Sequence, residues 1–195
     1  MFKKVLGGLA GLILTVSTSA MADDFDTSQH NFKLKQDKIS LEYRETLDSD
    51  KDHLQLGYDI SNNVTLEYRY VDADDIENRF RIKALHKWSD SLTVGSKIEY
   101  RSFQDADDHY RFIPIIRLST GSLHGMNGYV NFEPRFNFGK QGESNDLGVD
   151  ATQTKVGFDY NLTDTLTVGP FLQYETDGNF DKTDVFFGTA VSVNF

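Results

Sequence analysis

A short charged triplet, Glu-x-Arg, recurs along this chain. Successive side chains of a β-strand point to opposite faces, so the Glu and the Arg of one triplet share a face while the middle residue lies on the other. Guanidinium groups bind carboxylates in a bidentate manner, so aligned copies would build a charged wall able to bind anions. The copies are Glu42-Tyr43-Arg44, Glu67-Tyr68-Arg69, Glu99-Tyr100-Arg101 and Glu133-Pro134-Arg135, with Gln173-Tyr174-Glu175 as a degenerate fifth.

Other basic residues alternate with apolar residues in the segments between the triplets. If the strands close into a barrel, the same alternation predicts a basic interior, although the whole chain has a formal net charge of −10. The candidate solute-binding residues of this interior are Arg44, Arg69, Arg81, Lys83, Lys97, Arg101, Arg111, Arg117, Arg135 and Lys155. The predicted inward acids include Glu42, Asp59, Glu67, Glu99, Glu133, Asp159 and Glu175.

A tight β-hairpin pattern occurs three times in the sequence, and these hairpins position the charged residues. Each copy has apolar or ring residues at alternate positions, a short turn of Ser, Thr, Asn or Asp, and then an apolar-Thr-apolar segment. The copies span residues 58–66, 86–94 and 160–168. Two of them run into a Glu-Tyr-Arg triplet and the third into Gln-Tyr-Glu, so one unit encodes both an apolar face and a charged face.

Ten strands follow from the alternation, each about long enough to cross a bilayer at a tilt. They lie near residues 38–46, 52–60, 63–71, 79–88, 91–103, 109–119, 128–138, 151–160, 165–175 and 183–195. Short turns alternate with longer, acidic or Gly-bearing loops, as in bacterial outer-membrane barrels. We therefore predict an all-β fold, a transmembrane antiparallel up-and-down barrel of about ten strands with twelve as the alternative. An even count places both chain ends on the periplasmic side.

The composition agrees with this fold class. Hydrophobic residues make up 38% of the chain, which is low for a buried core, while aromatic residues reach 13%. Rings gather where the predicted strands end, as in the aromatic girdles of membrane barrels. The competing interpretation is a secreted β-sandwich, but a sandwich buries its apolar face and has fewer rings at strand ends.

The two ends of the chain predict export and insertion. Residues 1–22 have the basic start, the short apolar run and the Ala20-Met21-Ala22 site of a cleaved signal peptide. Residues 23–37 form a polar segment, either a periplasmic tail or a short piece that enters the barrel, and residues 38–195 form the barrel. The alternating C-terminal strand ends at Phe195, which resembles the signal recognised by the barrel-insertion machinery. The expected location is the bacterial outer membrane, with lipid and lipopolysaccharide as neighbours.

Other classes of function find little support. The acidic balance argues against nucleic-acid binding, and the absence of cysteine excludes disulfides and a lipid anchor on cysteine. The acidic loops 72–75 and 105–109 could hold an Asp/His pair that activates water, as in barrel enzymes. A solvated acidic loop is the simpler interpretation, and no hydrolase or metalloprotease motif is present. We expect a monomer with no enzymatic activity, no cofactor and no metal.

Two interpretations of the charged interior remain open. In one, Glu and Arg neutralise each other and fill a closed barrel, as side chains do in barrels of about eight strands. In the other, the arginines line a narrow channel and select anions. The first gives a structural or surface-interaction protein, and the second a porin-like channel.

Parts of several strands resemble the KdgM-type oligogalacturonate-specific porin family. The resemblance lies in residues 39–45, the basic strand 111–118, residues 132–136 and the terminal strand that ends at Phe195. It implies a small monomeric outer-membrane porin for acidic oligosaccharides, with Arg44, Arg111, Arg117 and Arg135 in arginine stripes along the lumen. The members of that family look like twelve-strand barrels, whereas ten strands are predicted here. A barrel with fewer strands would have a narrower lumen.

Overall fold

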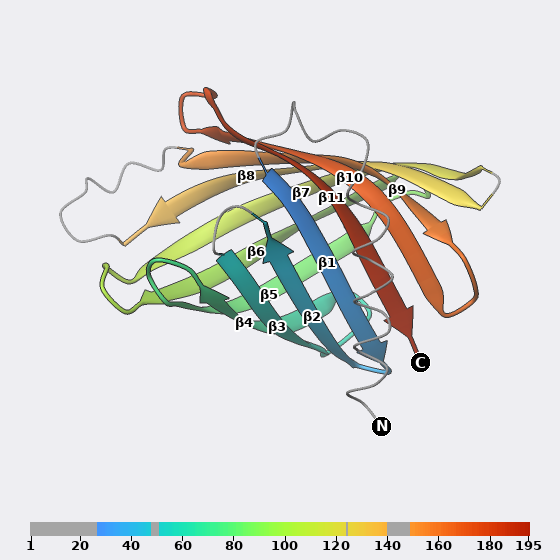
Figure 1. Cartoon of the computed structure of the whole chain (residues 1–195), viewed down its shortest axis with the longest axis horizontal. Coiled ribbons are helices and arrows are strands. Elements are labelled where there is room, and N and C mark those ends of the chain that lie inside the picture. The colour runs from blue at the N-terminus through green and yellow to red at the C-terminus, as the bar shows by residue number, and fades with distance from the viewer. Residues whose placement is uncertain (1–26, 48–50, 124, 140–148) are drawn as a thin grey trace.

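The computed structural model describes residues 27–47, 51–123, 125–139 and 149–195 as a closed barrel of eleven strands (Figure 1). Each strand pairs antiparallel with its neighbours in the chain, and β1 closes the barrel against β11. The strands are β1 (Thr27–Gln36), β2 (Ile39–Thr46), β3 (Lys51–Asp59), β4 (Val64–Asp72), β5 (Glu77–Lys87), β6 (Leu92–Phe103), β7 (His109–Leu123), β8 (Met126–Phe138), β9 (Ala151–Asn161), β10 (Leu166–Asp177) and β11 (Lys182–Asn194).

The ten predicted strands correspond to β2–β11, and the predicted count is wrong by one strand. The additional strand is β1, so the barrel begins at Thr27 rather than at residue 38. Apart from Phe32 and Leu34, β1 is polar, and for that reason it lacks the alternation that marks the other strands. Backbone pairing to β2 and β11 places it in the wall. The predicted signal peptide, residues 1–22, lies outside the described residues.

An odd number of strands changes how the barrel closes. Strands that alternate in direction leave β1 and β11 parallel, and Thr27 pairs with Phe186 while Lys35 pairs with Asn194. The β1 strand therefore starts at the end of the barrel that carries the longer loops, whereas β11 finishes at the end that carries the short turns. The expectation that the first and last strands start and finish at one side is wrong for the described strands.

The three predicted hairpin turns are confirmed and share one geometry. In each, the first turn residue donates its backbone N–H to the residue that starts the next strand, as Ser61 does to Val64 at 3.2 Å, Ser89 to Leu92 at 3.1 Å and Thr163 to Leu166 at 3.2 Å. The hydroxyl of the same turn residue accepts a backbone N–H in return. Hydroxyl side chains therefore close all three turns.

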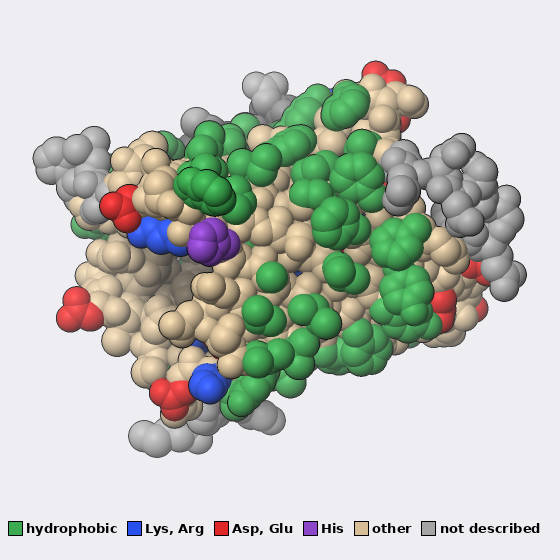
Figure 2. Space-filling model, turned by 180° about the vertical axis from the view of Figure 1, so that it is seen from behind, with side chains coloured by type: hydrophobic (Ala, Val, Ile, Leu, Met, Phe, Trp, Pro, Cys, Tyr) green, Lys and Arg blue, Asp and Glu red, His purple; other side chains and the backbone are tan. Residues whose placement is uncertain are grey.

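The outer wall of the barrel is apolar (Figure 2). Each strand from β2 to β10 has at least one exposed side chain from the predicted outward set, and others of that set, such as Tyr70, Val94 and Phe136, are partly exposed. Strongly exposed members are Ile39, Leu41, Leu54, Leu56, Leu66, Phe80, Ile82, Ile98, Ile116, Leu118, Val130, Val156, Phe158 and Leu172. Among the described residues, no helix is long and apolar enough to cross a membrane.

Tyrosines at the long-loop end mark the boundary of this apolar wall. Tyr43 donates its hydroxyl to Asp52 at 3.0 Å, and Tyr68 donates to Asn78 at 2.6 Å. Tyr100 donates to Asp108 and also lies 5.2 Å, ring to ring, from Tyr110. Each ring lies on the apolar wall and each hydroxyl reaches a polar group near a loop, which is the arrangement expected of an interfacial girdle.

Candidate functional site: the charged interior

Two cavities lie inside the barrel, and together they are lined by all ten predicted basic residues. The upper cavity, toward the long loops, has a volume of about 390 Å³, and the lower cavity, toward the short turns, about 220 Å³. Lys83 and Arg117 line the lower cavity, and Arg101, Arg111, Arg135 and Lys155 line the upper one. Both cavities are bounded by Arg44, Arg69, Arg81, Lys97, Asn131 and Glu133, which form the layer where the two meet.

The upper cavity is more basic than the sequence predicted. Ten of its lining residues are Lys or Arg and four are Asp or Glu. Two of the ten, Lys51 and Arg79, were missing from the predicted set. Arg79 could have been found, since it lies two residues before Arg81 and period 2 gives both the same face. Lys51 was assigned to a loop and begins β3 instead.

One row of residues around β4–β7 alternates in charge. Glu67 lies opposite Arg81, Arg81 opposite Glu99, and Glu99 opposite Arg111 in the strand register. Arg81 donates to Glu67 at 2.9 Å and to Glu99 at 2.7 Å, and both partners are buried. Buried charge is tolerated when it is paired in this way. This row stabilises the interior and leaves little free charge.

The next row toward the long loops is entirely basic. Arg69 lies opposite Arg79, Arg79 opposite Arg101, and Arg101 opposite His109. Like charges that face each other directly across strands are destabilising. Glu77 is the carboxylate that compensates for them, accepting from Arg79 at 2.7 Å and from Arg101 at 2.9 Å. Glu77 is shared by two of the three guanidinium groups, while Arg69 bonds to Gln55 instead, so the row keeps a net positive charge.

Several other basic residues pair with acids on the next strand but one. Lys97 on β6 reaches Glu133 on β8 at 2.6 Å, and Arg135 on β8 reaches Glu175 on β10 at 3.2 Å. Two further bridges join Arg111 to Asp150 at 2.9 Å, and Arg117 to Asp159 at 3.1 Å. Each bridge spans a strand that lies between its partners, so the pairs brace the inner wall.

Arg69 and Lys155 have no carboxylate partner among the described residues. Arg69 donates twice to the side-chain oxygen of Gln55, at 2.5 and 2.8 Å, and is 8% exposed. The Lys155 ammonium lies 4.0 Å from the centroid of the Phe171 ring. Neither cation is paired with a carboxylate within the described part of the barrel, and the same holds for Lys51.

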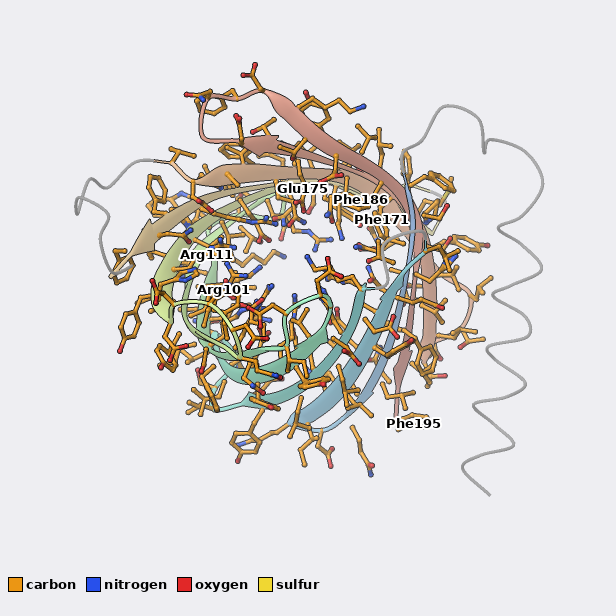
Figure 3. The ribbon with its side chains drawn as sticks, turned by 60° about the vertical axis from the view of Figure 1, so that its left-hand side comes forward. Arg101, Arg111, Phe171, Glu175, Phe186 and Phe195 are labelled. Carbon is orange, nitrogen blue, oxygen red and sulfur yellow. The ribbon has the colours of Figure 1, made fainter. Side chains whose placement is uncertain are left out.

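Apolar side chains also face the interior, which the sequence pattern did not predict. Phe186 and Ile113 line the upper cavity. Phe171 covers Gly188, where a Cβ atom would lie 2.4 Å from the ring. Arg101 and Arg111 extend inward from β6 and β7, while Phe171, Glu175 and Phe186 come from β10 and β11 on the facing wall (Figure 3). The upper cavity thus has a basic wall and a partly apolar wall.

Where the loop that follows β6 meets β7, Asp108 and His109 each contact residues of β6. Asp108 accepts the Phe103 backbone N–H at 3.0 Å and the Tyr100 hydroxyl, and the hydrogen bond from Tyr100 holds the pKa of this carboxyl below its usual range. His109 is buried at the start of β7, with its ring stacked on Phe103. Within the described residues, no three His, Asp or Glu side chains are grouped to hold a metal ion.

No family model matches this chain, and no curated protein matches it either. The functional argument therefore rests on the geometry of the interior.

Proposed function

We propose that this protein is a small outer-membrane channel for anionic solutes, of which acidic oligosaccharides are the leading class. The observation that carries the proposal is the upper cavity, where ten basic residues face four acidic ones in a protein that is acidic overall. Rings of basic side chains select anions in pores. Solutes would cross by passive diffusion, without a cofactor or a catalytic step.

The membrane location is part of the same proposal. It is supported by the exposed apolar wall of β2–β10 and by the tyrosines whose hydroxyls reach polar groups near the long loops. The C-terminal strand β11, which Phe195 follows, supports insertion by the barrel-insertion machinery, with lipopolysaccharide and lipid around the wall. We propose a monomer of the kind that the KdgM-type porins exemplify, with one strand fewer than a twelve-strand barrel.

A closed, salt-bridged barrel is the second candidate. It is favoured by the paired row of Glu67, Arg81 and Glu99, which lies where the two cavities meet. Small barrels are filled by side chains, and a filled barrel would serve as a structural or surface-interaction protein. The two candidates differ in one measurable property, which is the passage of ions.

Single-channel recording in planar bilayers separates them. The proposal expects discrete conductance steps and a reversal potential that favours chloride over potassium in a salt gradient. Complete absence of conductance, from protein that migrates as a folded barrel in unheated gels, would sink the channel proposal and leave the closed barrel.

Charge reversal inside the upper cavity tests the role of the arginines. Arg101→Glu and Arg135→Glu should each shift the selectivity toward cations, because both side chains line that cavity. Lys87→Glu is the matched control, since Lys87 is 65% exposed and lines neither cavity. Unchanged selectivity in both lumen variants would remove the arginines from the mechanism even if the pore conducts.

A further inference from the structure

The layer where the two cavities meet contains one internal ion pair. Six residues line both cavities, and among the bridges of the described residues only Lys97–Glu133 has both of its partners in this layer. The Lys97 ammonium lies 2.6 Å from one Glu133 carboxylate oxygen, and Asn131 donates to the other oxygen at 2.6 Å. A solute that moves from one cavity to the other therefore passes this pair.

This ion pair is held less firmly than its neighbour in the layer, Arg81. Arg81 bonds to two carboxylates, Glu67 and Glu99, and its side chain is 6% exposed. Lys97 bonds to one carboxylate among the described residues, and its side chain is 15% exposed. An ammonium on a flexible four-carbon stem can turn to a new acceptor, whereas a guanidinium fork is fixed by its several hydrogen bonds. The Lys97–Glu133 bridge is thus the contact of the layer that opens at least cost.

A second lysine lies within reach of the same carboxylate. Lys155 on β9 lies opposite Asn131 in the β8–β9 register, and Glu133 faces inward two residues further along β8. Diagonal neighbours of this kind are close enough for long side chains to touch. Lys155 has no carboxylate partner among the described residues, and its ammonium lies 4.0 Å from the centroid of the Phe171 ring. Glu133 therefore stands between a lysine that it holds and a lysine that it can reach.

The strand segment that carries Glu133 is less firmly tied to its neighbour than the rest of the wall. Within the described residues, the pairing of β7 with β8 skips 113–115 and 133–135 and then resumes in the same register, so Pro114 and Pro134 face each other. Proline has no backbone N–H to donate to a ladder. Glu133 directly precedes Pro134, so the interruption lies at the same level as the ion pair.

We propose that the Lys97–Glu133 bridge is a gate between the two cavities, which opens when Glu133 exchanges Lys97 for Lys155. In the closed state the bridge runs from β6 to β8 past the inner face of β7. In the open state Glu133 pairs with Lys155 of β9, and the Lys97 ammonium is free to attract a passing anion. Each state keeps one ion pair, so neither leaves the buried carboxylate uncompensated. The inference rests on the proposed anion channel and adds the step that controls passage through it.

Single-channel recording of the full-length chain in planar bilayers tests the gate through the ratio of closed to open time. Lys97→Met removes the closed-state bridge and should lower this ratio about tenfold, the effect of losing one charge-assisted hydrogen bond. Lys155→Met removes the open-state partner and should raise the ratio about tenfold. Lys87→Met is the matched control, because Lys87 is 65% exposed and lines neither cavity.

The opposite signs separate a gate from a static effect of charge. Both lysines line the upper cavity, so if each acted only through its charge, removing either would change anion passage in the same direction. Changes of the same sign, or no change in either variant, would overturn the exchange. In a Glu133→Gln background both lysine effects should vanish, since Glu133 is the shared partner, and effects that persist there would overturn its role.

Failure of the gate and failure of the channel can be told apart. Each variant is first shown to migrate as a folded barrel in unheated gels, and Lys97→Gln replaces Lys97→Met if the latter does not fold. Current in the wild type without the opposite shifts would overturn the gate alone. Current in the Lys97 variant but not in the wild type would support the gate in a barrel that is closed at rest. Absence of current in both would overturn the channel and the gate together.

Discussion

The β4–β6 wall and the β1 seam both place polar side chains inside the barrel. The two regions differ in whether the hydrogen-bonding groups of those side chains have partners. On the β4–β6 wall, Glu67, Arg81 and Glu99 are buried and directly paired. At the seam, Gln29 and Asn31 each leave a buried side-chain oxygen without a partner among the described residues. The β1–β11 pair is also parallel, and parallel pairing is slightly less stable per residue than antiparallel pairing.

The wall and the seam therefore contribute differently to the stability of the barrel. The paired wall holds the charges in fixed positions, and its register makes the interior rigid. The seam carries buried polar atoms that have no partner among the described residues, and it closes the barrel with a strand of low apolar content.

Removing the central charge of the paired wall should have the largest effect on stability. Arg81→Met leaves Glu67 and Glu99 buried without their shared partner, which should lower the free energy of unfolding by about 3–5 kcal/mol. Urea titration of the protein in lipid vesicles measures the change. Lys83→Met is the matched control: Glu67 keeps Arg81, and the Lys83 side chain is 22% exposed, so the loss should be much smaller. Equal losses of unfolding free energy in both variants would show that Arg81 stabilises the barrel no more than Lys83 does.

Hydrogen exchange should show the seam opening before the paired wall. Backbone amides of residues 28–31 should exchange at least about tenfold faster than those of residues 66–70, because local opening follows the stability of each region. Exchange followed by mass spectrometry gives both rates in one experiment. Comparable protection of the two segments would mean that the parallel seam is as strong as the antiparallel wall.

Replacing an unsatisfied group at the seam should stabilise the barrel. Asn31→Val removes a buried amide whose oxygen has no partner among the described residues, so the free energy of unfolding should rise by about 1 kcal/mol. Asn131→Val should do the opposite, because Asn131 donates to Glu133 at 2.6 Å. The same urea titration measures both, and a destabilised Asn31→Val variant would contradict the weakness assigned to the seam.

The smallest effect is expected at the ion pair that anchors the short-turn end of β1. Lys35 and Asp59 lie 2.7 Å apart, with side chains 38% and 29% exposed. Lys35→Ala should cost about 0.2–1 kcal/mol, and the cost should shrink in high salt because exposed charges are screened. A loss that is large or independent of salt would show that this end is held as firmly as the paired wall.

Most of the wall could be predicted from local pattern. The alternation places the ten strands β2–β11 and the inner face of all ten predicted basic residues, since both depend only on period 2. The three hairpin turns follow from their hydroxyl residues. Arg79 was missed at a strand boundary, although its spacing from Arg81 placed it on the inner face.

The pairing of charges could not be predicted in the same way. The Glu-x-Arg triplets predicted a charged wall, but which charges face each other depends on the register, which interleaves Arg81 with Glu67 and Glu99, and places Arg79 between Arg69 and Arg101. A shift of register between neighbouring strands would exchange these partners without any change in sequence pattern. The charge of each row is therefore a property of the assembled barrel.

The sequence by itself determined which residues form β2–β11 and which of their side chains face inward. The alternation of apolar and polar residues is local, so it can be read within each strand separately. Only the tertiary structure decided the strand count, the parallel seam and the pairing of charges across the strands. Whether the polar segment β1 joins the wall depends on the free edges of β2 and β11, which lie at opposite ends of the chain and meet only when the barrel closes.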